Sequence, residues 1–285
     1  MDIVLHDQTR NDVEAFINQP VHSLLISAPM GSGKLYLARN IAARLIGIKQ
    51  AKLTNYPYFF HITKTGQSIT VDTIRELKAF TQLKTAGDAA IRRVIIIENA
   101  ELMTTEAQNA LLKILEEPPK DTVLILTADF LGGLLPTIRS RVRQLVVNKP
   151  SASDLINLFK TSHDEATITK TYHMSGGRIG LMHALLNEST DHPLAQQVAL
   201  AKQVLSKTPY ERLLMSSVIS DENIELFLTA LYNVAHAALK SAIEKNSEKL
   251  VRRWYHTCKV INESQNMLER KPQLKLLLTN LFINL

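Results

Sequence analysis

The chain has 285 residues, of which 45% are hydrophobic, so it suits one large domain or two to three small ones with a substantial core. Its net charge of +6 allows contact with nucleic acid or with an acidic partner, but surface lysines alone can give such a value. The single cysteine, Cys258, excludes a disulfide within the chain and a zinc site built from several thiolates.

Five short hydrophobic runs in the first half of the chain have the length and composition of buried strands, and helical patterns separate them. The runs are residues 23–27, 58–62, 94–97, 122–126 and 144–147, and the clearest helical patterns are residues 35–46 and 71–83. Strands that alternate with helices predict a parallel sheet covered on both faces, so the expected fold class is α/β.

The second half of the chain changes character after residue 150, because helical patterns follow one another there without a further strand. We expect three domains: an α/β domain over residues 1–149, a small helical domain over 150–190 and a helical domain over 191–285. The N-terminus has an acid at position 2, and no run reaches about 18 apolar residues, so we expect a cytoplasmic protein without a secretory signal or a membrane span.

Residues 26–38, "ISAPMGSGKLYLA", contain a degenerate form of the phosphate-binding pattern G-x-x-x-x-G-K-[ST]. A strand runs into a glycine-rich turn and then into a helix, which is the context that a phosphate loop requires. The groups expected to face a phosphate belong to Gly31, Ser32, Gly33 and Lys34. Ala28 replaces the first glycine, and Leu35 replaces the hydroxyl that would bind Mg²⁺. The alternative is a glycine-rich turn that only caps the helix.

The third hydrophobic run is followed by Glu98 and Asn99, where a nucleotide-hydrolysing domain presents one acid to Mg²⁺ and another to the attacking water. The amide of Asn99 cannot accept a proton from water, and Glu98 is one methylene longer than the usual aspartate. The loop and this degenerate Walker B strand therefore both lack groups that nucleotide hydrolysis requires. We expect no hydrolysis by the chain, while weak binding of ATP or ADP stays open.

The segment "TTEAQNALLKILEEPP" has the period of an amphipathic core helix. Thr105 and Gln108 fit a capping box at its start, and Pro118 and Pro119 stop it.

The exact residues of this segment are more specific than the spacing of its apolar positions. "ENAELMTTEAQNALLKILEEPP" followed by "LLPTIRSRVRQL" resembles the subunits of the bacterial replicative clamp loader of DNA polymerase III, a branch of the AAA+ ATPases. Residues 68–80 and 174–186 resemble further family segments, so the likeness covers about residues 20–186. The degenerate loop is similar to that of the delta-prime subunits rather than gamma/tau. The family's four-cysteine zinc module is missing, so no zinc is expected.

The resemblance assigns roles to two arginines. "SRV" at residues 140–142 takes the place of the family's Ser-Arg-Cys motif, which implies that Arg141 is an arginine finger acting on the ATP of a neighbouring subunit. Arg139 and Arg143 flank it, so the alternative is a basic helix end that complements the helix dipole. Arg178 resembles the second sensor of the family, with a plain surface cation as its alternative.

The resemblance also implies domains and partners. It makes the three domains an AAA+ RecA-like nucleotide-loop domain, a helical lid and a collar for oligomerisation. The implied partners are other loader subunits (gamma/tau and delta) in a pentamer, the sliding clamp, and primed DNA through the assembled complex, with no membrane. The chain is then a stator without ATPase or polymerase activity of its own. The alternatives are an ATP-hydrolysing gamma/tau-like motor and a stand-alone module that binds ADP for stability.

Two other groups of residues give weaker indications of a function. The histidines of the second half, His163, His173, His183 and His192, lack the spacing of metal ligands and are expected on helix surfaces. Trp254 and Tyr255 beside two arginines could stack on bases, but their helical spacing favours core packing.

Overall fold

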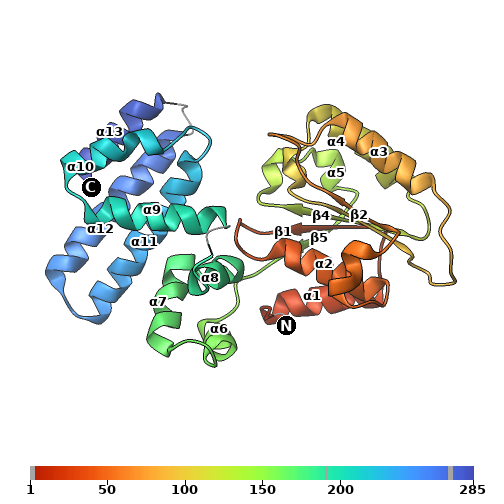
Figure 1. Cartoon of the computed structure of the whole chain (residues 1–285), viewed down its shortest axis with the longest axis horizontal. Coiled ribbons are helices and arrows are strands. Elements are labelled where there is room, and N and C mark those ends of the chain that lie inside the picture. The colour runs from red at the N-terminus through yellow and green to blue at the C-terminus, as the bar shows by residue number, and fades with distance from the viewer. Residues whose placement is uncertain (1–3, 190–191, 269–271) are drawn as a thin grey trace. The chain divides into compact units, whose positions relative to one another are not determined.

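The computed structural model describes residues 4–189, 192–268 and 272–285 (Figure 1). These residues form two compact units, which meet in the sequence between Lys149 and Pro150. The expected boundary between lid and collar, at residues 190 and 191, lies outside the described residues. The division of the second unit into two domains therefore stays a prediction.

The first unit is built around a parallel sheet. Its strands are β1 (Ser23–Ser27), β2 (Phe59–Ile62), β3 (Arg93–Ile97), β4 (Thr122–Ala128) and β5 (Arg143–Val146). Its helices are α1 (Asp7–Asn18), α2 (Lys34–Leu45), α3 (Val71–Gln82), α4 (Thr105–Glu116) and α5 (Pro136–Arg139), with single 3-10 turns at Gln50–Asn55, Ala100–Leu102 and Leu131–Gly133. The five predicted strands and the two clearest predicted helices are confirmed within one or two residues at each end.

The sheet has the order β2-β3-β4-β1-β5, so the first strand of the sequence lies between the last two. Leu24 of β1 pairs in register with Ile125 of β4 and with Arg143 of β5. Because every pairing is parallel, the carboxyl ends of the strands share one edge of the sheet and the amino ends share the other. Ligands of such sheets bind outside the carboxyl edge.

Side chains of the strands alternate between two hydrophobic cores, because the side-chain period of a strand is two. Leu24 faces the core that α1 and α2 close, where it meets Phe16 and Ile41. Leu25 faces the opposite core, which α3, α4 and α5 close with residues such as Leu111. Figure 1 shows these two helix layers on the two faces of the sheet. The predicted α/β fold with both faces covered is confirmed.

The start of α4 differs from the predicted capping box. Thr104 rather than Thr105 is the N-cap, and its hydroxyl oxygen accepts a hydrogen bond of 3.2 Å from the amide of Ala107. Gln108 does not cap the helix, since it is 4% exposed and bonds elsewhere. The prediction is wrong by one residue because two adjacent threonines offer equivalent caps, and local sequence does not choose between them.

The second unit consists of helices in the described residues. They are α6 (Ala152–Phe159), α7 (Glu165–Ser175), α8 (Ile179–Leu186), α9 (Pro193–Ser206), α10 (Pro209–Leu214), α11 (Ile224–Glu244), α12 (Glu248–Leu268) and α13 (Leu274–Asn284), with a 3-10 turn at Met215–Val218. Its core lies where α11 packs against α9, α12 and α13, around residues such as Phe227, Ile261 and Phe282.

The helix α11 is long and apolar. Among the described residues, it is the helix that has the length and hydropathy of a membrane span. Only 39% of its most apolar window is buried in the unit. A core helix of a globular protein passes the same test of length and composition, so this finding is weak evidence for a membrane.

Candidate functional site

The glycine-rich loop follows β1 at the carboxyl edge of the sheet and leads directly into α2. Gly31 and Gly33 have φ angles of 85° and 83°, a region that residues with a Cβ rarely adopt. Gly33 is the N-cap of α2, and Lys34 is the first residue of that helix. The loop therefore ends at a helix N-terminus, where backbone N–H groups and the helix dipole favour an anion.

The anion beside the loop lysine is a carboxylate of the chain itself. The amine of Lys34 donates a hydrogen bond to Asp129, which directly follows β4, and the two form an ion pair. The Lys34 side chain is 9% exposed and that of Asp129 is 21% exposed. The charge that a phosphate loop offers to a nucleotide is thus already compensated.

A second carboxylate supports this pair. Glu101 Oε1 accepts a hydrogen bond of 2.8 Å from the backbone N–H of Asp129, while its Oε2 is buried without a hydrogen-bond partner. Burial raises the pKa of the Glu101 carboxyl, and the nearby carboxylate of Asp129 adds to that effect. A Cβ at Gly133 would lie 2.8 Å from the Cβ of Glu101, so only glycine fits at this approach. Two acids, Asp129 and Glu101, therefore lie beside the loop lysine.

The remaining loop residues are also engaged within the chain. The Ser32 hydroxyl donates a hydrogen bond of 2.6 Å to the carbonyl of Pro29. Leu35, which stands in place of the Mg²⁺ hydroxyl, packs against the core that α1 and α2 close. The loss of a metal ligand at Leu35 stays a prediction.

The degenerate Walker B residues lie at the same edge of the sheet. Glu98 follows β3, and its Oε2 lies 3.2 Å from Nε2 of His61, at the end of neighbouring β2. Asn99 has a φ of 51°, and its backbone N–H donates a hydrogen bond of 3.0 Å to the hydroxyl of Thr127. The structure brings Glu98, Asn99 and the loop together at the carboxyl edge, and their roles in nucleotide binding stay predictions.

Arg141 lies at the opposite edge of the sheet. Its backbone carbonyl accepts a hydrogen bond of 3.0 Å from the hydroxyl of Ser23, the first residue of β1. The loop starts beyond the last residue of that strand, about 16 Å away at roughly 3.3 Å per residue. Arg141 therefore does not face the phosphate loop of its own chain.

The guanidinium of Arg141 is tethered at the surface. Its Nη2 lies 2.8 Å from Oε1 of Glu116, the last residue of α4, and its Nη1 donates to the carbonyl of Thr137 at 3.1 Å. The two charged side chains are 38% and 49% exposed. An ion pair this exposed is worth at most about 1 kcal/mol, so a stronger anion can displace Glu116.

The two flanking arginines have different surroundings. The guanidinium of Arg143 lies over the ring of Phe16, 5.8 Å from its centroid, on the face covered by α1. Arg139 is the exposed last residue of α5, and its carbonyl accepts a hydrogen bond from Gln144. Val142, the departure from the family motif, is 8% exposed and belongs to the core. The residue after Arg141 therefore packs into the core, while Arg139 on its other side stays at the surface.

Gln108, which the sequence pattern placed in a helix cap, is instead a buried residue that bridges two segments. Its side-chain N–H groups donate to the carbonyls of Met103 at 3.2 Å and Gly133 at 2.9 Å. Its side-chain oxygen accepts from the backbone N–H of Leu135 at 2.7 Å. One buried amide therefore fixes the segment between Asp129 and α5, which links the loop edge to the helix before Arg141.

The sequence also singled out Arg178, four histidines and Trp254 with Tyr255 in the second unit. Arg178 is the half-buried residue before α8, in a different unit from the loop. Among the described residues, no cluster of histidine, cysteine or carboxylate side chains has the arrangement of metal ligands. Trp254 packs against the helical core as expected, whereas Tyr255 is 65% exposed and does not.

A parallel sheet in this strand order, with a glycine-rich loop between β1 and α2, defines a P-loop domain of the AAA+ class. The comparisons place the chain more narrowly. A family model described as "DNA polymerase III, delta subunit" matches residues 10–151. The chain is similar to bacterial DNA polymerase III clamp-loader subunits, most of all to delta-prime members.

Individual relatives show the extent of the likeness. The DNA polymerase III subunit delta' of Pseudomonas aeruginosa is 32% identical over 208 residues, which are 66% of this chain and 63% of that protein. The gamma/tau subunit of Mycobacterium bovis is 34% identical over 137 residues, which are 42% of this chain and 23% of that protein. A crystal structure of a gamma-subunit-related protein from Thermotoga maritima has 20% sequence identity and a TM-score of 0.49. The superposition covers 97% of this chain and 98% of that protein's chain.

The matched part of the chain spans between 41% and 63% of the length of three delta' relatives. The activity and the partners of those whole proteins are therefore taken up as proposals.

Proposed function

We propose that this chain is a non-hydrolysing, delta-prime-like subunit of a DNA polymerase III clamp loader, which acts as a stator while other subunits turn over ATP. The observation that carries the proposal is the ion pair between Lys34 and Asp129 in a loop that has Leu35 in place of the Mg²⁺ hydroxyl. ATP or ADP would have to displace an internal carboxylate and would find no hydroxyl for the metal. Binding is therefore weak, and hydrolysis lacks both the metal ligand and a water-orienting acid.

In the same proposal, Arg141 is an arginine finger supplied in trans. Its position at the amino edge of the sheet separates it from the loop of its own chain, so it is suited to the nucleotide of a neighbour rather than its own. Its tether to Glu116 is weak enough to exchange for phosphate oxygens. The planar guanidinium then neutralises the charge that develops on the γ-phosphate.

The proposed partners are gamma/tau and delta subunits in a pentamer, the sliding clamp, and primed DNA through the complex, all in the cytoplasm and without a membrane. We assign the nucleotide-loop domain to residues 1–149, the lid to 150–190 and the collar that joins subunits to 191–285. Arg178 is assigned to the lid as a second-sensor residue without a nucleotide of its own chain to contact.

Reconstitution tests the proposal. The purified chain is expected to show no ATP turnover, and its addition to the other loader subunits is expected to raise their clamp- and DNA-stimulated ATPase and their clamp loading. Turnover by the isolated chain above about 1 s⁻¹, an ordinary enzyme's rate, contradicts the stator role. A chain that does not associate with loader subunits supports the stand-alone ADP-binding module instead.

A second candidate function is a gamma/tau-like motor. The identity of 34% to a gamma/tau subunit over 137 residues favours it. The motor requires hydrolysis by this chain, so the same turnover measurement separates the two functions.

A further inference from the structure

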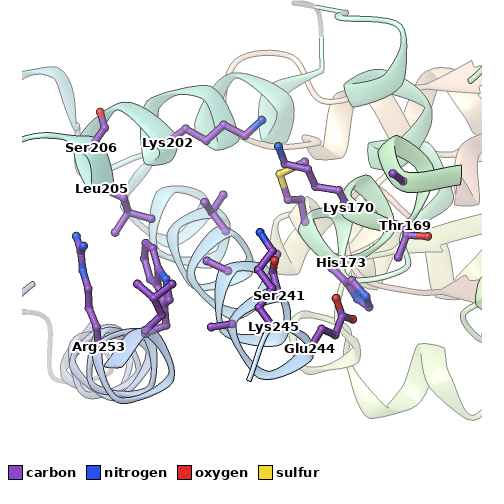
Figure 2. Close-up of a pocket in the computed structure, with 18 of the residues that line it drawn as sticks. Thr169, Lys170, His173, Lys202, Leu205, Ser206, Ser241, Glu244, Lys245 and Arg253 are labelled. Carbon is purple, nitrogen blue, oxygen red and sulfur yellow. The ribbon is translucent and has the colours of Figure 1, made fainter. Parts of the chain in front are cut away.

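A groove of about 960 Å³ lies in the second unit, between α7, α9, α11 and α12 (Figure 2). Its floor is α11, which contributes Val234, Ala237, Ala238, Ser241 and Ala242. Counted from Val234, these residues stand at positions i, i+3, i+4, i+7 and i+8, so they form one face of the helix. The side chains of that face are small, and small side chains allow a second helix to approach closely. The floor therefore has the shape of a helix-packing surface without a helix on it.

The walls of the groove are apolar near the floor and basic at the rim. Leu205, Leu250 and Trp254 line the groove from α9 and α12, and Leu250 is 39% exposed. The apolar surface that α11 leaves uncovered thus continues onto two neighbouring helices. On the floor itself Val234, Ala237, Ala238 and Ser241 are half-buried, while Ala242 is buried.

The charges at the rim are mainly positive. Lys170, Lys202, Lys245 and Arg253 line the groove, against Glu165 and Glu244 as the acids. Figure 2 shows the amines of Lys170 and Lys202 pointing toward one another from α7 and α9. No acidic side chain of the described residues forms an ion pair with any of the four cations. Two facing ammonium groups repel one another, so an anion between them would stabilise both.

The environment of Lys202 also favours an anion between the two lysines. Lys202 is exposed overall, but partial desolvation of its amine lowers its pKa, and the charge of Lys170 lowers it further. Both effects penalise the charged amine in the free protein. A carboxylate placed between the two lysines would remove the second penalty and offset the first.

We propose that the groove binds an acidic amphipathic α-helix of a partner protein. The small-residue face of α11 receives the apolar face of that helix, and Lys170, Lys202 and Arg253 pair with carboxylates along its flanks. Helix-in-groove binding of this kind places apolar anchors three and four residues apart in the groove. The basic rim selects against a basic helix by like-charge repulsion.

The full-length chain and defined peptides test the proposal. The probes are three fluorescein-labelled 18-residue peptides: a helix with leucine and alanine on one face and glutamate on its flanks, the same peptide with two central prolines, and the same helix with lysine flanks. Fluorescence anisotropy gives the dissociation constant of each. We expect the acidic helix to bind at least tenfold more tightly than either of the others.

Substitutions locate the binding. Charge reversal by Lys170→Glu with Lys202→Glu is expected to weaken the acidic helix at least tenfold, and Ala238→Arg is expected to block the floor. The control is Lys160→Glu, which reverses an exposed charge outside the groove and should leave binding unchanged. Circular dichroism checks that each variant is folded.

Several results would overturn the proposal. They are equal binding of all three peptides, no binding of the acidic helix at about 1 mM, or unchanged binding by the doubly reversed variant. Binding of anionic phosphatidylglycerol vesicles or of octyl phosphate through these lysines, without binding of the acidic helix, would also overturn it. Those two outcomes would assign the groove to a membrane surface or to a small amphiphilic anion.

Discussion

The amine of Lys34 is paired with the carboxylate of Asp129, so the loop that resembles a nucleotide site holds an anion of its own chain. The two residues are 95 positions apart in the sequence and meet because β1 and β4 are neighbours in the sheet. The pair occupies the carboxyl edge, where ligands of parallel sheets bind.

Replacing Asp129 should therefore open the loop to phosphates. Asp129→Asn removes the carboxylate charge and leaves a buried ammonium uncompensated, which costs on the order of 3 kcal/mol of stability. Added tripolyphosphate or ATP should restore part of the melting temperature and bind at least tenfold more tightly than to the unmodified chain, as measured by calorimetry. Hydrolysis should stay absent, because Leu35 still provides no metal ligand.

The control for this gain is Lys34→Ala combined with Asp129→Asn. That double variant lacks the cation, so its affinity for polyphosphate should fall back to the level of the unmodified chain. Equal affinities in the presence and absence of Lys34 would show that the lysine does not contact the phosphates.

Arg141→Ala should leave the chain folded and assembled but lower the stimulated ATPase of the reconstituted loader. A trans arginine finger accelerates hydrolysis by about 10³ to 10⁵, which is far more than an exposed ion pair contributes to stability. Arg141→Lys should not restore the rate, because an ammonium lacks the planar fork that contacts two oxygens. Steady-state ATPase assays with clamp and primed DNA measure the effect.

Two matched variants separate the finger from its surroundings. Arg139→Ala removes an exposed arginine of the same short segment and should have a smaller effect. Glu116→Ala removes only the tether of Arg141, so assembly should persist and the ATPase should stay near normal. An Arg141→Ala loader that hydrolyses ATP at the full rate would reduce Arg141 to a helix-end cation.

Gln108→Ala should destabilise the first unit. It removes the partners of two carbonyls and one N–H group around a side chain that is 4% exposed. Each buried polar group left unpaired costs about 1–3 kcal/mol, so the total is on the order of 3 kcal/mol after partial rehydration. Urea unfolding monitored by circular dichroism measures it. Gln82→Ala, at the exposed end of α3, is the control and should change stability little.

The start of α10 should stabilise the second unit in a pH-dependent way. The backbone N–H and the hydroxyl of Thr208 donate to Glu211 and lower the pKa of that carboxyl to about 2. A folded pKa below the ordinary value of 4.5 means that the carboxylate stabilises the fold above pH 4.5. That contribution is lost as the pH falls from there toward about 2.

Glu211→Gln checks this sign. The variant should melt at a lower temperature than the unmodified chain at pH 7, and the difference should shrink as the pH is lowered from 4.5 toward 2. A difference that stays constant over this range would mean that the charge of Glu211 does not contribute.

The strands, the α/β class and the degenerate loop follow from the sequence alone, because each depends on residues close together in the chain. Hydrophobic runs of four or five residues set the strands, and Gly33 with Lys34 marks the start of α2. The missing hydroxyl at Leu35 is likewise a local fact. Such local patterns can be recognised without knowing which residues pack against them.

Only the tertiary structure decided what those residues contact. The partners of Lys34, Arg141 and Gln108 come from other elements, and sheet order and helix packing bring them together. Asp129 follows a buried strand, which is a signal the sequence does carry, but its pairing with Lys34 depends on β4 lying beside β1. The groove on α11 was equally hidden, because an apolar helical face has the same sequence pattern whether it is covered or open.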